Sequence, residues 1–77
     1  MIRITVNGAV GEVAESTLSF ERLIEVAGHV YGHSFSPECS VTFRRAAGER
    51  SEGILSPGQK VEIQEGTIFN VYLTGSA

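Results

Sequence analysis

The chain has 77 residues, of which 42% are hydrophobic, with a net charge of −3 and a single cysteine. This length allows one domain, and the hydrophobic fraction is too high for a disordered chain. The negative charge argues against a nucleic-acid partner, and no apolar run approaches the roughly 20 residues that a membrane helix needs. Because one cysteine cannot form an internal disulfide, we expect a reducing, cytoplasmic setting.

The first predicted element is a β-hairpin. Apolar and polar residues alternate over residues 2–6, which predicts a strand with one apolar face. Asn7 and Gly8 follow, and they favour a two-residue turn because both tolerate positive φ. The return strand is predicted over residues 9–14. Its two valines are out of phase, and a bulge at Gly11 would restore the phase.

A helix is predicted after the hairpin. Apolar residues recur there at spacings of three and four, which is typical of one helix face: Phe20, Leu23, Ile24, Ala27, Val30 and Tyr31. Ser19 is the predicted N-cap, since its hydroxyl can accept a backbone N–H of the first turn. Gly28 is predicted to end the helix as a left-handed C-cap, with residues 30–31 in a last loose turn. We expect the helix to pack through the first four of its apolar residues.

The second half of the chain is predicted to contain three strands. They cover residues 41–44, 61–63 and 67–73, with an extended connection over 32–40 and an irregular arm over 51–55. Alternation divides the last strand between two faces, with Phe69, Val71 and Leu73 on one and Ile68, Asn70 and Tyr72 on the other.

The order of these elements predicts an α+β fold. A hairpin, a helix and further strands, each with one apolar face, can bury those faces as a sheet packed on the helix. The order is that of the β-grasp fold, with a mixed sheet of four to five strands and the last strand parallel to the first in mid-sheet. We expect the domain to cover residues 1–74 and a flexible tail to cover residues 75–77.

Four stretches of the sequence carry a family resemblance: ITVNG, TLSFERLIEVAG, VTFRRAAGE and EGILSPGQKVEIQEGTIFNVYLTG. Together they resemble the bacterial multi-ubiquitin domain and related small bacterial ubiquitin-like proteins, over most of the chain outside residues 32–40. The resemblance implies a protein modifier that is not itself an enzyme and holds no cofactor. It also implies four kinds of partner: an ATP-dependent activating enzyme, a conjugating enzyme, a metallopeptidase and target proteins. The three enzymes are typically encoded beside such a modifier, in operons that are associated with defence against phage. ATP is used by the activating enzyme.

The resemblance places the reactive group in the C-terminal tail, where the chain departs from the Gly-Gly ending of ubiquitin. Gly75 is the implied conjugation residue if a peptidase removes Ser76 and Ala77, and Ala77 takes that role without processing. Glycine suits a narrow enzyme channel because it has no Cβ. The residues implied to be gripped by the activating enzyme precede it: Tyr72, Leu73 and Thr74. An ordinary frayed terminus is the alternative.

A partner surface is expected on the sheet face that points away from the helix. Alternation assigns five residues to it: Thr42, Arg44, Ile68, Asn70 and Tyr72. Arg44 could pair with a partner carboxylate, and Tyr72 is of a type enriched at interfaces. The alternative is a solvated face with ordinary cross-strand pairs.

His29, His33 and Cys39 invite a metal-site interpretation, since the two histidines are spaced i, i+4. Glycines interrupt the helix between them and a fourth ligand is missing, so we expect surface histidines and no metal site. Cys39 is expected to be a buried, small apolar residue or an idle thiol rather than a nucleophile.

Two other functions remain open for a chain of this fold. A sulfur carrier shares the activation step but needs an exposed Gly-Gly thiocarboxylate, which this tail does not offer. A ubiquitin-like interaction module that is never conjugated is the other alternative.

Overall fold

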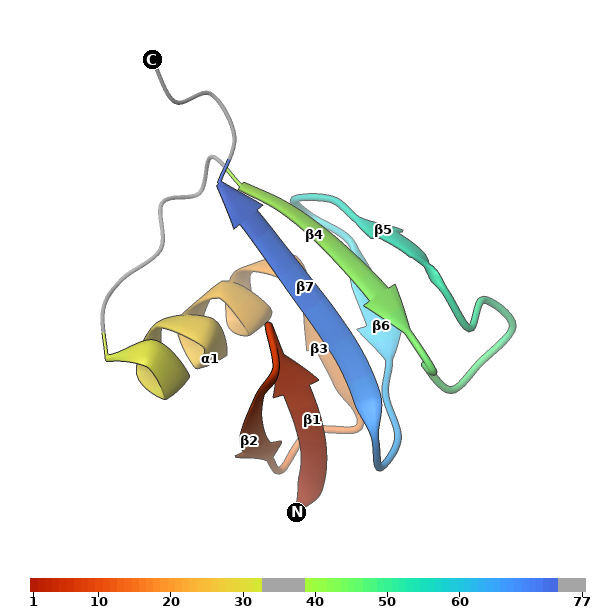
Figure 1. Ribbon diagram of the computed structural model, residues 1–77. Coiled ribbons are helices and arrows are strands. Elements are labelled where there is room, and N and C mark those ends of the chain that lie inside the picture. Colours follow the sequence, from red (N-terminus) through yellow and green to blue (C-terminus); the bar gives the residue numbers. More distant parts are fainter. Residues whose placement is uncertain (33–38, 74–77) are drawn as a thin grey trace.

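The computed structural model describes residues 1–32 and 39–73, which form a mixed five-stranded sheet with one helix packed on it (Figure 1). In chain order the elements are β1 (Ile2–Val6), β2 (Ala9–Val13), β3 (Thr17–Ser19), α1 (Phe20–Tyr31), β4 (Cys39–Arg44), β5 (Gly53–Leu55), β6 (Lys60–Glu62) and β7 (Thr67–Leu73). The large sheet has the order β2-β1-β7-β4-β5, and β3 pairs with β6 in a small second sheet. This arrangement confirms the predicted α+β fold of β-grasp type.

The last strand, β7, lies in the middle of the large sheet. It runs parallel to β1, with Phe69 opposite Val6, and antiparallel to β4, with Phe69 opposite Phe43. A parallel pair needs a long crossover connection, and the chain between β1 and β7 contains α1, which covers one face of the sheet (Figure 1). The predicted position of the last strand beside the first is therefore confirmed.

The start and the packing face of α1 follow the sequence pattern. Ser19 has an extended backbone, and its hydroxyl accepts the Arg22 N–H at 3.1 Å, so the predicted N-cap is confirmed. Three of the four predicted packing residues are buried and Ile24 is partly buried against the core; the three are Phe20, Leu23 and Ala27. Val26 is also buried and was not predicted, because the face that contacts the sheet is wider than the predicted stripe.

The end of α1 differs from the prediction. Gly28 lies inside the helix, which continues through Val30 to Tyr31. Gly32 is the C-cap, with φ of 76°, and its N–H bonds to the Gly28 carbonyl. A glycine inside a helix costs roughly 1 kcal/mol relative to alanine. Val30 packs against the core, and this contact favours keeping the last turn helical.

The strand β2 contains no bulge, contrary to the prediction for Gly11. It pairs with β1 in a regular register, and Gly11 lies opposite Ile4. Gly11 and Val13 point toward α1, whereas Val10 is 65% exposed on the other face. A Cβ at Gly11 would lie 2.9 Å from Val30 Cγ2. The glycine therefore does not correct the phase of the strand; it lets the helix approach the sheet closely.

Short strands account for the remaining differences. Residues 51–55, predicted as an irregular arm, contain β5, which pairs with β4. The strand predicted over 61–63 is β6, one residue earlier, and it pairs with β3, which was not predicted. The connection predicted over 32–40 overlaps β4, which begins at Cys39. Within the described ranges, α1 is too short and polar to cross a membrane.

Candidate functional site

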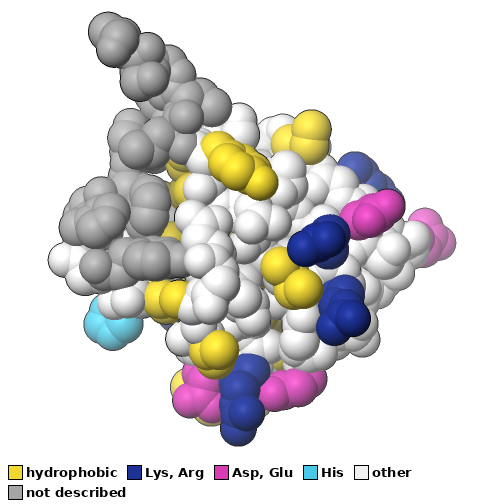
Figure 2. Space-filling view, in the orientation of Figure 1, with side chains coloured by type: hydrophobic (Ala, Val, Ile, Leu, Met, Phe, Trp, Pro, Cys, Tyr) yellow, Lys and Arg dark blue, Asp and Glu magenta, His cyan; other side chains and the backbone are white. Residues whose placement is uncertain are grey.

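The predicted partner surface is assembled on one face of the large sheet. All five of its residues come from β4 and β7 and define the outer sheet face: Thr42, Arg44, Ile68, Asn70 and Tyr72. The strand register sets Thr42 opposite Asn70 and Arg44 opposite Ile68. The intervening residues of the two strands are buried on the side of α1: Val41, Phe43, Phe69 and Val71. Figure 2 shows hydrophobic side chains interspersed with Lys and Arg side chains on this side of the molecule.

Two hydrophobic residues extend the outer sheet face and were not predicted. Ile54 is 61% exposed and lies opposite Thr42. Val10 is exposed and lies opposite Thr5, which in turn lies opposite Ile68. These positions depend on pairings between distant segments, and a three-residue strand such as β5 carries too short a pattern to reveal its phase.

Arg44 forms no ion pair within the described part of the chain. Among residues 1–32 and 39–73, no carboxylate lies within ion-pair distance of it. By contrast, the Nε of Arg3 on β1 lies 3.9 Å from a carboxylate oxygen of Glu12 and 3.9 Å from a carboxylate oxygen of Glu65. Arg44 is therefore the arginine of this face that can meet a carboxylate of another molecule without giving up an existing ion pair.

Asn7 holds the end of β7 in a way that the sequence did not reveal. Its side-chain Oδ1 accepts the Val71 N–H at 2.7 Å, and its Nδ2 donates to the Val71 carbonyl at 3.0 Å. Its own N–H donates to the Phe69 carbonyl at 3.0 Å. The amide group thus substitutes for the next peptide group of β1, which ends at Val6. Asn7 adopts φ of 48°, a conformation that asparagine tolerates better than most residues.

The predicted tail-recognition residues lie at the end of this strand. Tyr72 pairs with Ser40 and is 55% exposed, and Leu73 is the last residue of β7. Thr74, and the predicted conjugation residues Gly75 and Ala77, lie outside the described residues. β7 is thus paired on the β4 side up to its last residue, and on the β1 side it is held as far as Val71.

Two of the three residues considered for metal binding, His29 and Cys39, lie within the described residues. Cys39 is buried in β4, as predicted, and burial raises the pKa of its thiol, which disfavours the nucleophilic thiolate. His29 is exposed on α1, and His33 lies outside the described residues. No cluster of three potential ligands from His, Cys, Asp and Glu exists in the part of the chain that the structure describes.

Comparisons of this chain with protein-family models, with curated proteins and with solved structures give no match.

Proposed function

We propose that this domain is a ubiquitin-like protein modifier whose C-terminal tail is activated and joined to target proteins. The observation that carries the proposal is the position of β7. It is the central strand of a β-grasp sheet, held on both sides, and the tail that follows it leaves from a fixed base. The resemblance of the sequence to bacterial multi-ubiquitin domains supports the same function.

The chemistry takes place at the tail and on the partner enzyme. The tail carboxylate attacks the α-phosphorus of ATP, a carboxyl–phosphate bond forms and pyrophosphate leaves. A nucleophile of the activating enzyme then attacks the acyl carbon and AMP leaves. We assign the acyl carbon to Gly75, exposed after a metallopeptidase removes the residues beyond it; Ala77 would serve if no removal occurs. Without a Cβ, glycine leaves this carbon open to attack.

The outer sheet face would dock the activating and conjugating enzymes in the bacterial cytoplasm. Tyr72 supplies a large, partly apolar contact, and Arg44 supplies a cation that has no ion-pair partner among residues 1–32 and 39–73. The residues from Tyr72 to Thr74 would lie in the mouth of the channel of the activating enzyme and be gripped there. The pathway would be one of the operon-encoded conjugation systems associated with defence against phage.

Intact-mass analysis of the activating enzyme tests this proposal. The cognate activating enzyme is incubated with ATP and with a chain that ends at Gly75, or with the chain continued through Ala77. We expect a covalent adduct with the first chain, and none with the second until a peptidase is added. Gly75→Val should block adduct formation, because the branched Cβ crowds the acyl carbon.

Three outcomes would contradict parts of the proposal. An adduct that retains Ala77 would show that the unprocessed tail is reactive. Replacement of one oxygen by sulfur at the tail would identify a sulfur carrier. If no adduct forms with either chain, and no higher-mass conjugates form in cells that contain the neighbouring genes, the domain is an interaction module instead.

A further inference from the structure

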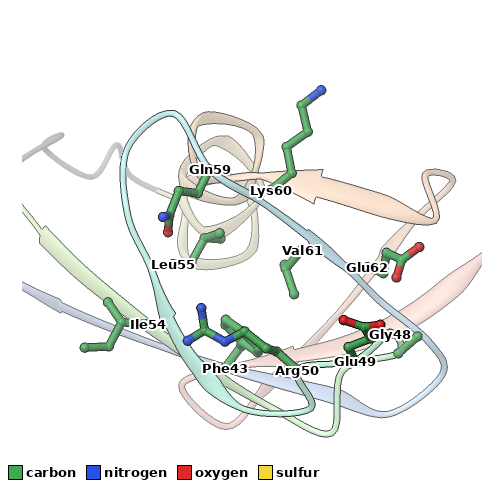
Figure 3. A pocket seen from close by; sticks show the side chains of 11 residues that line it. Phe43, Gly48, Glu49, Arg50, Ile54, Leu55, Gln59, Lys60, Val61 and Glu62 are labelled. Carbon is green, nitrogen blue, oxygen red and sulfur yellow. The ribbon is translucent and has the colours of Figure 1, made fainter.

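A pocket of about 370 Å³ lies between β5 and β6 and shares Ile54 with the extended outer sheet face (Figure 3). Its apolar lining includes Phe43, Leu55 and Val61, which also belong to the core. Ile54 lines it as well, although consecutive residues of a strand point to opposite faces of a sheet. A pocket that contacts both Ile54 and Leu55 lies at the edge of β5 and not on a face.

The strand β6 borders the same pocket along its edge. Three consecutive residues of β6 line it: Lys60, Val61 and Glu62. Among the described strands, β5 pairs only with β4, and β6 pairs only with β3. Each strand therefore directs the N–H and C=O of at least one residue away from its partner strand. We call this gap between two strand edges the β5–β6 pocket.

Backbone hydrogen bonds fix both ends of the β5–β6 pocket. At one end, the Ala47 N–H donates to the Glu62 carbonyl at 3.0 Å. At the other end, the Gln59 N–H donates to the Ser56 carbonyl at 2.9 Å, and the Ser56 N–H donates to Gln59 Oε1 at 3.0 Å. The first bond ties the loop before β5 to β6, and the other two close the turn between β5 and β6, so the pocket is formed before any ligand arrives.

A guanidinium group lies over the apolar lining. The Cζ of Arg50 is 6.0 Å from the centre of the Phe43 ring, and Figure 3 shows the side chain lying across that ring. Gly53 makes room for this position, because a Cβ there would overlap with Arg50 Nη2. Although Glu49 and Glu62 line the same pocket, no carboxylate of the described residues lies within ion-pair distance of Arg50.

We propose that the β5–β6 pocket binds an extended, acidic peptide segment of a partner protein, which adds a strand between β5 and β6. The two open strand edges match the backbone of an extended peptide. The apolar lining matches branched aliphatic side chains, and Arg50 matches a carboxylate on the residue between them. The volume is at the lower end of the range for ligand pockets, which fits a few residues of a peptide. The inference does not depend on the proposed function.

A short peptide of this chemistry tests the proposal. The probe is acetyl-TVDVT-amide, and its matched control is acetyl-TVNVT-amide, which lacks only the carboxylate. In amide NMR titrations of the full chain, we expect saturable shifts confined to Phe43 and residues 47–62, which include the lining of the pocket. Because hydrogen bonds to charged groups are stronger than neutral ones, the control should bind about tenfold more weakly.

Variants of the pocket separate this site from the outer sheet face. Arg50→Gln should reduce affinity for acetyl-TVDVT-amide about tenfold and should leave affinity for the control peptide unchanged. Gly53→Ala should weaken binding of the acidic peptide similarly, because the added Cβ displaces the guanidinium. Arg44→Gln, which removes an arginine from the outer sheet face, should have no effect. The amide spectrum of each free variant reports whether it is folded.

Several results would overturn the proposal. These are equal affinity for the two peptides, unchanged binding by a folded Arg50→Gln variant, and shifts centred on Thr42 and Asn70. Absence of any shift at millimolar peptide would also contradict it. Concentration-dependent shifts at the same residues without peptide would assign the pocket to a second copy of the chain instead.

Discussion

The two faces of the large sheet are built from the same strands but differ in accessibility. On the face covered by α1, side chains of β1, β4 and β7 are almost inaccessible: Ile4, Val6, Val41 and Phe69. On the outer sheet face, Thr42 and Asn70 are partly exposed and Tyr72 is mostly exposed. Alternation along each strand thus assigns one set of positions to stability and leaves the other set for contact with other molecules. Substitutions should therefore separate the two roles.

The largest effect is expected under α1. Leu23 is completely buried, so Leu23→Ala should lower the free energy of unfolding by about 2–5 kcal/mol, through lost contacts and a residual cavity. For a small domain this is a large part of the total stability. Denaturant titration measures the change, and Ile54→Ala on the outer sheet face is the matched control, expected to change stability by less than about 0.5 kcal/mol. Similar losses in both variants would contradict the division between the faces.

The link between the first turn and the end of β7 should contribute less. Asn7→Gly keeps a backbone that tolerates positive φ but removes both side-chain bonds to Val71. We expect a loss of about 1–3 kcal/mol, because partly buried backbone groups lose their partner. Amide hydrogen exchange at Val71 should accelerate more than exchange at Val41, which is the internal control. Equal acceleration at both would mean that Asn7 acts only on global stability.

The close approach of α1 to β2 can be tested by a double-mutant cycle. Gly11→Ala should destabilise the domain by roughly 1–3 kcal/mol, since the new methyl group meets Val30 Cγ2. The same substitution should cost less in a Val30→Ala background, where the obstructing methyl groups are absent. An equal cost in both backgrounds would show that Gly11 is required for another reason, such as its backbone conformation.

The ion pair between Arg22 and Glu15 predicts a small dependence of stability on pH. A hydrogen bond of 2.6 Å from Arg22 lowers the pKa of the exposed Glu15 carboxyl. Because this pKa is lower in the folded state than in the unfolded state, the ionised carboxylate stabilises the fold. The stabilisation is fully present above the unfolded pKa, roughly 4.3 for glutamate, and is lost as pH falls through the folded pKa. Glu15→Gln should therefore lower Tm near neutral pH, and the two Tm curves should converge in acid. Parallel curves down to the most acidic pH would contradict this contribution.

The order of elements could be predicted because hydrophobic periodicity is local information. Strands such as β1 and β7 and the stripe of α1 show their period within a few residues. The C-cap was misplaced because Gly28 and Gly32 look alike in sequence, and the packing of Val30 decides between them. β3 and β5 were missed because each has three residues and forms only through pairing with a distant strand.

The residues of the candidate sites also differ in whether a local sequence pattern could predict them. The five residues of the outer sheet face could be predicted from alternation within β4 and β7. Ile54 could not, because its phase depends on the register between β5 and β4. From the sequence, Asn7 is predicted only as a turn residue. Its bonds to Val71 could not be predicted, because they join segments that are 64 positions apart. The β5–β6 pocket likewise depends on how separate strands approach one another, which no local pattern encodes.

The smallest effect on stability is expected at Tyr72, where the comparison between faces can be made within one strand. Tyr72→Ala removes a mostly exposed side chain and should change the free energy of unfolding by less than about 0.5 kcal/mol. Val71→Ala, at the adjacent and buried position, should cost about 1.5–3 kcal/mol.

If the proposed function is correct, Tyr72→Ala should weaken binding to the activating enzyme about tenfold, because large amphipathic side chains contribute strongly at interfaces. Val71→Ala should leave binding unchanged under conditions where it is folded. Denaturant titration and a binding titration on the same two proteins measure both quantities. A Tyr72→Ala variant that unfolds, or a Val71→Ala variant that loses binding while folded, would mean that the two faces do not divide stability from recognition.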